Sequence, residues 1–67
     1  MPVVTVQMRK GRSKDAKRAL MRNVTDAVVD SIGADRGKVR VLIYEVDDAD
    51  WSVGGISYED QAKGEGI

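Results

Sequence analysis

At 67 residues, the chain is close to the lower size limit for a domain that folds alone. A domain of this size buries too little apolar surface to offset the ordering of its backbone, so it needs another source of stability. The sequence has no cysteine for a disulfide, and without histidine a zinc site with the usual nitrogen or sulfur ligands is not expected. Self-association is the remaining source, and we therefore expect an oligomer.

Three segments have the periodicity of regular secondary structure. Residues 3–8 are rich in β-branched side chains and alternate in polarity, which predicts a strand. Residues 14–32 repeat apolar side chains at helical spacing, with Ser13 as the expected N-cap and Gly33 as the glycine that ends the helix. Residues 38–46 again predict a strand, because they are rich in β-branched and other apolar residues.

This order of elements predicts an α+β fold built on one β-α-β unit, with parallel strands and a right-handed crossover. The single helix covers one face of the sheet, whereas the second strand is largely apolar on both faces, so the other face must meet a partner subunit. Gly54 and Gly55, between apolar residues, predict a short C-terminal hairpin over residues 51–56. We expect residues 1–67 to form a single domain whose tail, residues 57–67, is mobile unless a neighbouring subunit holds it.

Charged residues are balanced in number but not in position. Eleven basic and eleven acidic residues cancel, so the field that attracts nucleic acid is missing, and three aromatic residues offer few stacking platforms for bases. The C-terminal third is acidic, and we expect residues 47–50 within it to form a solvated loop. The N-terminal third is basic, which favours an anion site there. Its basic residues are Arg9, Lys10, Arg12, Lys14, Lys17, Arg18 and Arg22.

No apolar run approaches the roughly 20 residues that a membrane-spanning helix needs. The first residues also lack the basic and apolar regions of a signal peptide. We therefore expect no membrane partner and a cytoplasmic location, with which the absence of cysteine agrees.

Four strings of residues stand in an order and spacing that resemble the 4-oxalocrotonate tautomerase family. They are Met1-Pro2, Gly11-Arg12-Ser13, Val39-Arg40-Val41, and Trp51 followed by Val53-Gly54-Gly55. The resemblance covers residues 1–56 and implies a hexamer of three dimers with active sites at subunit contacts. It also implies cofactor-free enol–keto proton transfer in a small unsaturated 2-oxo or 2-hydroxy acid, such as 2-hydroxymuconate.

Pro2 is implied by the resemblance to be the general acid–base catalyst. Removal of Met1 would expose a secondary amine, but an ordinary α-amino group, with a pKa of about 7.7–8.0, is mostly protonated at neutral pH. An apolar pocket and neighbouring cations both disfavour the charged form, so we expect Arg12, Arg40 and Trp51 to lower the pKa of Pro2. The alternative is that proline is merely tolerated at a strand start, where its missing N–H is not needed.

Three further residues receive roles from the same resemblance. Arg12, next to the free N–H groups of the first helical turn, binds the substrate carboxylate remote from the reacting end. Arg40 reaches into a neighbouring subunit's site and stabilises the charge that develops on the 2-oxo or 2-hydroxy oxygen. Trp51 forms an aromatic wall. The alternatives are a solvated Arg12, an interfacial ion pair at Arg40 and a core anchor at Trp51.

Arg9 departs from the typical tautomerase pattern, which has an apolar residue at this position. The string Met8-Arg9-Lys10-Gly11-Arg12 is similar to one in the α subunit of trans-3-chloroacrylate dehalogenase, which makes Arg9 a further candidate for substrate binding. That enzyme also needs a carboxylate two positions beyond the aromatic residue, where this chain has Val53. We therefore prefer a tautomerase, with a cofactor-free dehalogenase or hydratase, or a non-catalytic subunit, as alternatives. A hetero-hexamer also stays open beside the homo-hexamer.

Overall fold

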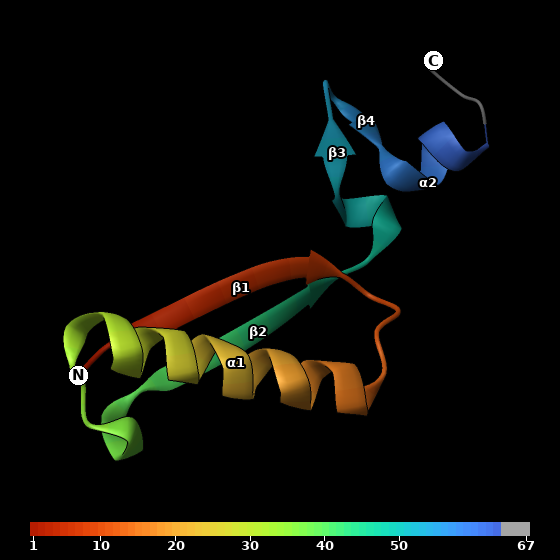
Figure 1. The fold of residues 1–67 in the computed structure, drawn as a ribbon. Helices are drawn as coiled ribbons and strands as arrows, with labels where there is room; N and C mark the ends of the chain where they lie inside the picture. Colours follow the sequence, from red (N-terminus) through yellow and green to blue (C-terminus); the bar gives the residue numbers. More distant parts are fainter. Residues whose placement is uncertain (64–67) are drawn as a thin grey trace.

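The predicted order of strand, helix and strand is realised as a β-α-β unit followed by a short hairpin and a small helix (Figure 1). The computed structural model describes residues 1–63, so the last residues of the predicted tail, 64–67, lie outside the described residues. The elements are β1 (Val3–Arg9), α1 (Lys14–Ile32), η1 (Arg36–Lys38), β2 (Arg40–Val46), η2 (Asp48–Asp50), β3 (Ser52–Val53), β4 (Ile56–Ser57) and α2 (Tyr58–Ala62), where η marks a single 3₁₀ turn.

Strands β1 and β2 pair in parallel, with Val3 opposite Arg40 and Arg9 opposite Val46. Successive side chains in a strand point to opposite faces, so each strand places one set of residues under α1 and the other on an uncovered face. The predicted fold class, an α+β fold with a parallel β-α-β unit and a C-terminal hairpin, is confirmed. The half-buried residues on the helix-covered face are Val4, Val6, Met8, Val41, Ile43 and Glu45.

Helix α1 begins and ends where the sequence predicts. The side-chain oxygen of Ser13 accepts a hydrogen bond from the backbone N–H of Ala16 at 3.1 Å, which satisfies one of the free donors of the first turn. At the other end, Gly33 adopts a left-handed conformation with a φ of 67°. Its N–H donates to the carbonyl oxygen of Val29 at 2.9 Å, so the last turn closes on a glycine for which this conformation is unstrained.

The Ser13 cap makes a testable contribution to stability. We expect Ser13→Ala to lower the free energy of unfolding by about 1 kcal/mol, because the N–H of Ala16 loses its acceptor. Ser31→Ala is the matched control, since Ser31 is a solvent-exposed residue of α1 and alanine is a better helix former than serine. Chemical denaturation at one fixed protein concentration measures both variants. An equal loss of stability in both would contradict the role of the cap.

The start of β2 differs from the prediction. Regular pairing begins at Arg40 and not at Lys38, because residues 36–38 form the 3₁₀ turn η1. The side chain of Asp35 caps this turn by accepting the N–H of Gly37 at 3.2 Å. A local cap of this kind competes with the strand pairing that the β-branched composition predicts.

The predicted hairpin is confirmed as β3 and β4, with Gly54 and Gly55 at φ values of 64° and 85°. Left-handed conformations at both central positions are typical of the tight turns that join twisted strands. Helix α2 was not predicted, because five residues are too few to show a helical period. We call residues 48–62 the C-terminal arm; in Figure 1 it extends beyond the end of the β1–β2 sheet, away from α1.

A single chain leaves much apolar surface in contact with solvent. None of the described residues is fully buried. The Cα radius of gyration is 15.8 Å, compared with about 11 Å for a compact domain of this length. The uncovered sheet face exposes 58% of Val3, 38% of Leu42 and 52% of Tyr44. This surface is what the expected self-association would cover. Among the described residues, no helix is both long and apolar enough to cross a membrane.

Candidate active site

The five predicted site residues fall into two groups at opposite ends of the β1–β2 sheet. Pro2 precedes β1 and Arg40 opens β2, and the backbone N–H of Arg40 donates to the carbonyl oxygen of Pro2 at 3.0 Å. Arg9 is the last residue of β1, and Arg12 and Trp51 follow the other ends of β1 and β2. Arg9 lies seven positions after Pro2 along an extended chain, which is a distance of about 23 Å. A single chain therefore does not bring the five residues together.

At the first end, the side chains of Pro2 and Arg40 belong to different faces of the sheet. Arg40 pairs with Val3 and shares its uncovered face, whereas Pro2, one residue earlier, falls on the opposite face. The Arg40 side chain is exposed, and its Nη1 donates to the carbonyl oxygen of Lys38 at 3.2 Å. Its guanidinium contacts no carboxylate of the described part of the chain, so it is free to meet an anion or a second subunit.

At the second end, Arg12 lies immediately before the N-cap of α1, as predicted. Its side chain is exposed at the rim of a hollow that it shares with Met8, Ala16 and Leu20. Within residues 1–63, Arg12 forms no ion pair. A free guanidinium beside the unsatisfied N–H groups of a helix start is well placed to bind a carboxylate.

Trp51 forms one wall of a second hollow, of about 320 Å³, at the same end of the sheet. Gln7 and Val46 also line it, and both lie on the face of the sheet that α1 leaves uncovered. The indole ring is half-buried and stacks on Tyr58, with ring centroids 6.2 Å apart and planes inclined by 11°. This hollow therefore opens towards the surface that a second subunit would cover.

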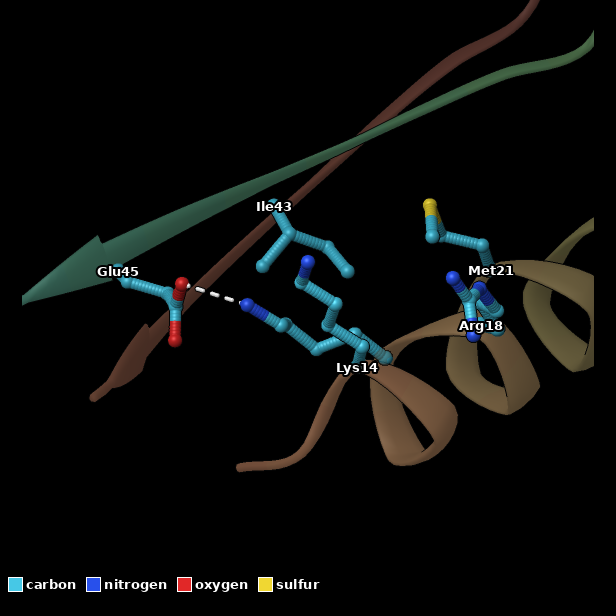
Figure 2. Close-up of a pocket in the computed structure, with 6 residues that line it drawn as sticks. Lys14, Arg18, Met21, Ile43 and Glu45 are labelled. Carbon is cyan, nitrogen blue, oxygen red and sulfur yellow. Dashed lines mark hydrogen bonds and ion pairs between the residues drawn. The ribbon is translucent and has the colours of Figure 1, made fainter. Parts of the chain in front are cut away.

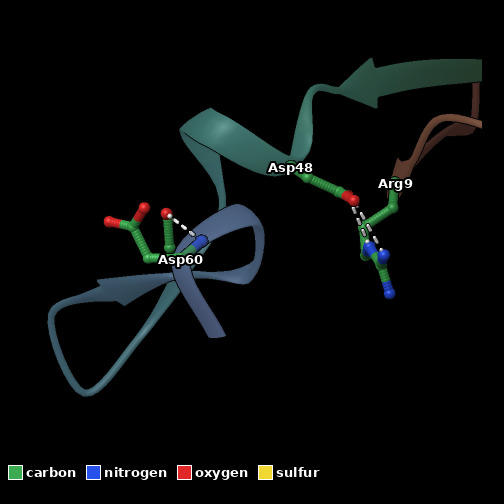
Figure 3. A network of polar contacts seen from close by, with 4 residues as sticks. Arg9, Asp48 and Asp60 are labelled. Atoms are coloured by element: carbon green, nitrogen blue, oxygen red, sulfur yellow. Dashed lines mark hydrogen bonds and ion pairs between the residues drawn. The ribbon is translucent and has the colours of Figure 1, made fainter. Parts of the chain in front are cut away.

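Arg9 is engaged by the C-terminal arm. Its Nε donates to Oδ1 of Asp48 at 2.7 Å and its Nη2 to Oδ2 at 3.0 Å, a two-point interaction shown in Figure 3. The guanidinium carbon also lies 4.4 Å from the centroid of the Tyr58 ring. Beside it, Lys10 pairs with Asp47 at 3.0 Å. Residues 47–50 are largely exposed, as expected of a solvated loop, but residues 48–50 form the 3₁₀ turn η2, and two of the carboxylates bind cations of the N-terminal third.

Sequence reasoning missed Asp48 and Tyr58 as partners of Arg9. The available signal was the opposite charge of the two ends of the chain. That asymmetry predicted an anion site among the basic residues. Two of these basic residues, Arg9 and Lys10, bind the carboxylates of Asp48 and Asp47 of the same chain.

The hydrogen bond from Arg9 holds the pKa of Asp48 below its usual range, and the same interaction raises the pKa of Arg9. A lowered carboxyl pKa contributes stability above the pKa of the unfolded group, and this contribution is lost as the pH falls through the lower folded value. The hydrogen bond with Asp47 likewise raises the pKa of Lys10. Asp48, Arg9 and Lys10 therefore stay charged near neutral pH.

A further hollow, of about 470 Å³, lies between α1 and β2 and holds none of the five predicted residues (Figure 2). Glu45 falls on the helix-covered face of β2, where its Oε1 accepts from Nζ of Lys17 at 2.8 Å. This pair explains how a charged residue is tolerated under the helix. The other residues around the hollow are Lys14, Arg18, Met21 and Ile43.

Comparison with known proteins gives consistent matches over most of the chain. A family model described as "Tautomerase enzyme" matches residues 2–61. A probable tautomerase of Ralstonia nicotianae is 45% identical over 56 residues, which cover 84% of this chain and 80% of that protein. A 2-hydroxymuconate tautomerase of Comamonas testosteroni is 39% identical over 57 residues, covering 85% and 90% of the two chains. A heterohexamer 4-oxalocrotonate tautomerase from Chloroflexus aurantiacus superposes with a TM-score of 0.85 at 33% identity, covering 90% of this chain and 97% of the other.

Proposed function

Because the chain belongs to the tautomerase family and is a 4-oxalocrotonate tautomerase-like isomerase, we propose that it uses Pro2 as its acid–base catalyst. The family resemblance that the four strings of residues indicate is confirmed by these matches. The observation that carries the proposal is the pairing of the two strand starts, through the hydrogen bond from Arg40 to Pro2. The proposed base and Arg40 therefore share one end of the sheet on opposite faces, and the Arg40 guanidinium, which no described carboxylate neutralises, is available to the Pro2 of a neighbouring subunit.

The proposed reaction moves one proton within a small unsaturated 2-oxo or 2-hydroxy acid. Once Met1 is removed, the uncharged nitrogen of Pro2 accepts the proton of the 2-hydroxyl group. The resulting dienolate carries a negative charge, which the Arg40 guanidinium of a neighbouring subunit stabilises. The protonated Pro2 then returns the proton to a carbon of the conjugated system, which completes the keto isomer and restores the neutral base.

A closed assembly would join the two groups of site residues. If a second copy packs against this one with its strands antiparallel, the Pro2 end of one chain meets the Trp51 end of the other. Arg12 and Trp51 of that partner then bind and enclose the substrate. We propose a hexamer of three such dimers, built from one type of chain; native mass spectrometry of the purified protein would show six identical subunits. One similar protein is a heterohexamer, so the same measurement must also exclude a second type of chain.

Activity towards 2-hydroxymuconate and phenylenolpyruvate, assayed on protein of known intact mass, tests the proposal directly. The mass must be lower than that of the full sequence by one methionine residue, because an attached Met1 makes the Pro2 nitrogen an amide. Isomerisation of either acid by the trimmed protein supports the proposal. Trimmed protein that is inactive with both would instead favour a non-catalytic subunit.

The proposed role of Arg12 predicts a change in substrate affinity. We expect Arg12→Ala to raise KM about 10–100-fold with little change in kcat, because a charge-assisted contact to the remote carboxylate is lost in both ground and transition states. Arg22→Ala is the matched control, since Arg22 is an exposed residue of α1 outside the proposed site. Steady-state kinetics distinguishes the two variants. A fall in kcat without a rise in KM for Arg12→Ala would mean that its role is assigned wrongly.

A further inference from the structure

We infer that Arg9 is a positioning residue for Trp51: it holds the C-terminal arm through Asp48 and Tyr58 and thereby fixes the indole ring, and it is not a substrate ligand. The inference rests on the proposed function in one respect, since it takes Trp51 as a wall of the active site. It also assigns a role to the residue at which this chain departs from the tautomerase pattern.

The donor geometry of Arg9 argues against direct substrate binding. A guanidinium binds a carboxylate most strongly through two parallel N–H groups on one edge. The edge formed by Nε and Nη2 is already occupied by the two oxygens of Asp48, at 2.7 and 3.0 Å. One face of the same group lies over the Tyr58 ring, 4.4 Å from its centroid. A substrate carboxylate could reach only the remaining edge of Nη1 and Nη2, on a guanidinium whose charge Asp48 already neutralises.

The contacts continue from Tyr58 to Trp51. The two rings stack, and the backbone N–H of Tyr58 donates to the carbonyl oxygen of Trp51 at 2.8 Å. Within the arm, the side-chain amide of Gln61 donates to the carbonyl oxygen of Ile56 at 3.0 Å, and Ser57 accepts from the N–H of Asp60 at 3.1 Å. Figure 3 draws this hydrogen bond of Asp60 in the same view as the pair of Arg9 and Asp48. The arm is thus internally bonded, and a displacement of Tyr58 would carry Trp51 with it.

Arg9 joins this arm to the sheet at a point where the chain offers few other links. The arm follows β2 through Asp47 alone, and the uncovered surface around it gives little packing in a single chain. Lys10 pairs with Asp47 before the arm begins, whereas Arg9 reaches both η2 and α2. Arg9 is the last residue of β1, so its contacts fix the C-terminal arm relative to the sheet. The position of the arm in turn sets the position of Trp51.

Fluorescence of Trp51 gives a readout that does not depend on activity, because the chain contains one tryptophan. The variants are Arg9→Ala, Asp48→Ala and Arg9→Lys, with Lys10→Ala as the matched control. Lys10 is the adjacent residue, carries the same charge and pairs with the neighbouring aspartate. Native mass spectrometry first establishes that each variant keeps the wild-type oligomer. Arg9→Lys keeps the charge without the planar fork, and it serves as the milder variant if Arg9→Ala does not assemble.

We expect Arg9→Ala, Asp48→Ala and Arg9→Lys to shift the Trp51 emission and to increase its fast depolarisation in the absence of substrate, whereas Lys10→Ala matches the wild type. The double variant of Arg9 and Asp48 is expected to change the signal no more than either single variant, because both remove the same contact. Where activity is measurable, all three variants should lower kcat several-fold.

Wild-type Trp51 fluorescence in Arg9→Ala would overturn the inference. So would a lower KM in Asp48→Ala together with a higher KM in Arg9→Ala, since that pattern identifies Arg9 as a substrate ligand released from its internal partner. If the wild-type protein isomerises neither test acid, the proposed function fails, but the fluorescence comparison still decides whether Arg9 positions Trp51.

Discussion

Blocking the nitrogen of Pro2 is expected to abolish isomerisation of 2-hydroxymuconate, and Pro2→Ala is expected to lower kcat/KM by about 10²–10⁴-fold. A short N-terminal extension that a protease can remove makes the first comparison within one preparation. Before cleavage the Pro2 nitrogen is an amide and cannot accept a proton. Cleavage that leaves a free Pro2 should restore the rate. The difference between the two rates then reports only whether the Pro2 nitrogen is an amide or an amine.

Pro2→Ala complements this comparison, because removal of Met1 would still leave an amine at the same place. A primary amine lacks the ring that holds the proline nitrogen in one orientation, so the alignment that proton transfer needs is lost. An unchanged oligomer in native mass spectrometry is the control for assembly. Equal rates for the extended and cleaved proteins, or for Pro2→Ala and the wild type, would contradict a catalytic Pro2.

The pH dependence of kcat/KM provides an independent test of the environment of Pro2. The base is active when uncharged, so the rate is expected to fall as the pH drops through the pKa of the Pro2 nitrogen. If burial and neighbouring guanidinium groups lower that pKa, the fall occurs below the range of an ordinary α-amino group, about 7.7–8.0. The Arg9–Asp48 pair does not obscure it, because the lowered pKa of Asp48 keeps that carboxylate charged throughout neutral pH. A rate that rises only above this range would show a hydrated amine.

The sequence predicts the elements whose causes are local. The limits of α1 follow from Ser13 and Gly33, and the hairpin follows from Gly54 and Gly55, because each depends on residues within one turn. The short helix α2 was missed for the opposite reason, since five residues show no period and its cap is a single serine, Ser57.

The candidate site was less predictable, because its contacts depend on the whole fold. Arg9 and Asp48 are 39 positions apart, and only the parallel pairing of β1 with β2 places the ends of both strands together. The predicted group of Pro2, Arg40, Arg12 and Trp51 also does not form within one chain. The resemblance supplies these residues, and their union requires a subunit arrangement that no pattern along a single sequence contains.

Arg40→Ala is expected to lower kcat about 10²–10³-fold with a much smaller change in KM, because the guanidinium acts on charge that develops in the transition state. Arg40→Lys should recover part of the loss, since it restores the charge without the planar geometry. Arg36→Ala, which removes a nearby exposed arginine paired with Asp26, is the matched control and should have near-wild-type kinetics. A rise in KM alone would assign Arg40 to ground-state binding.

The same variant tests whether the site is shared between chains. Arg40 points from the face of Val3, opposite to that of Pro2 in its own chain, so the guanidinium that meets each Pro2 is proposed to come from a neighbour. Subunits with Arg40→Ala and subunits with a blocked Pro2 are each expected to be inactive alone. When the two are unfolded and refolded together, some sites receive a free Pro2 from the first and an intact Arg40 from the second, and activity should reappear. Mixing the already folded oligomers should restore nothing until subunits exchange. If mixed oligomers of confirmed composition stay inactive, both groups of each site come from one chain. That result would contradict the placement of Pro2 and Arg40 on opposite faces of the sheet.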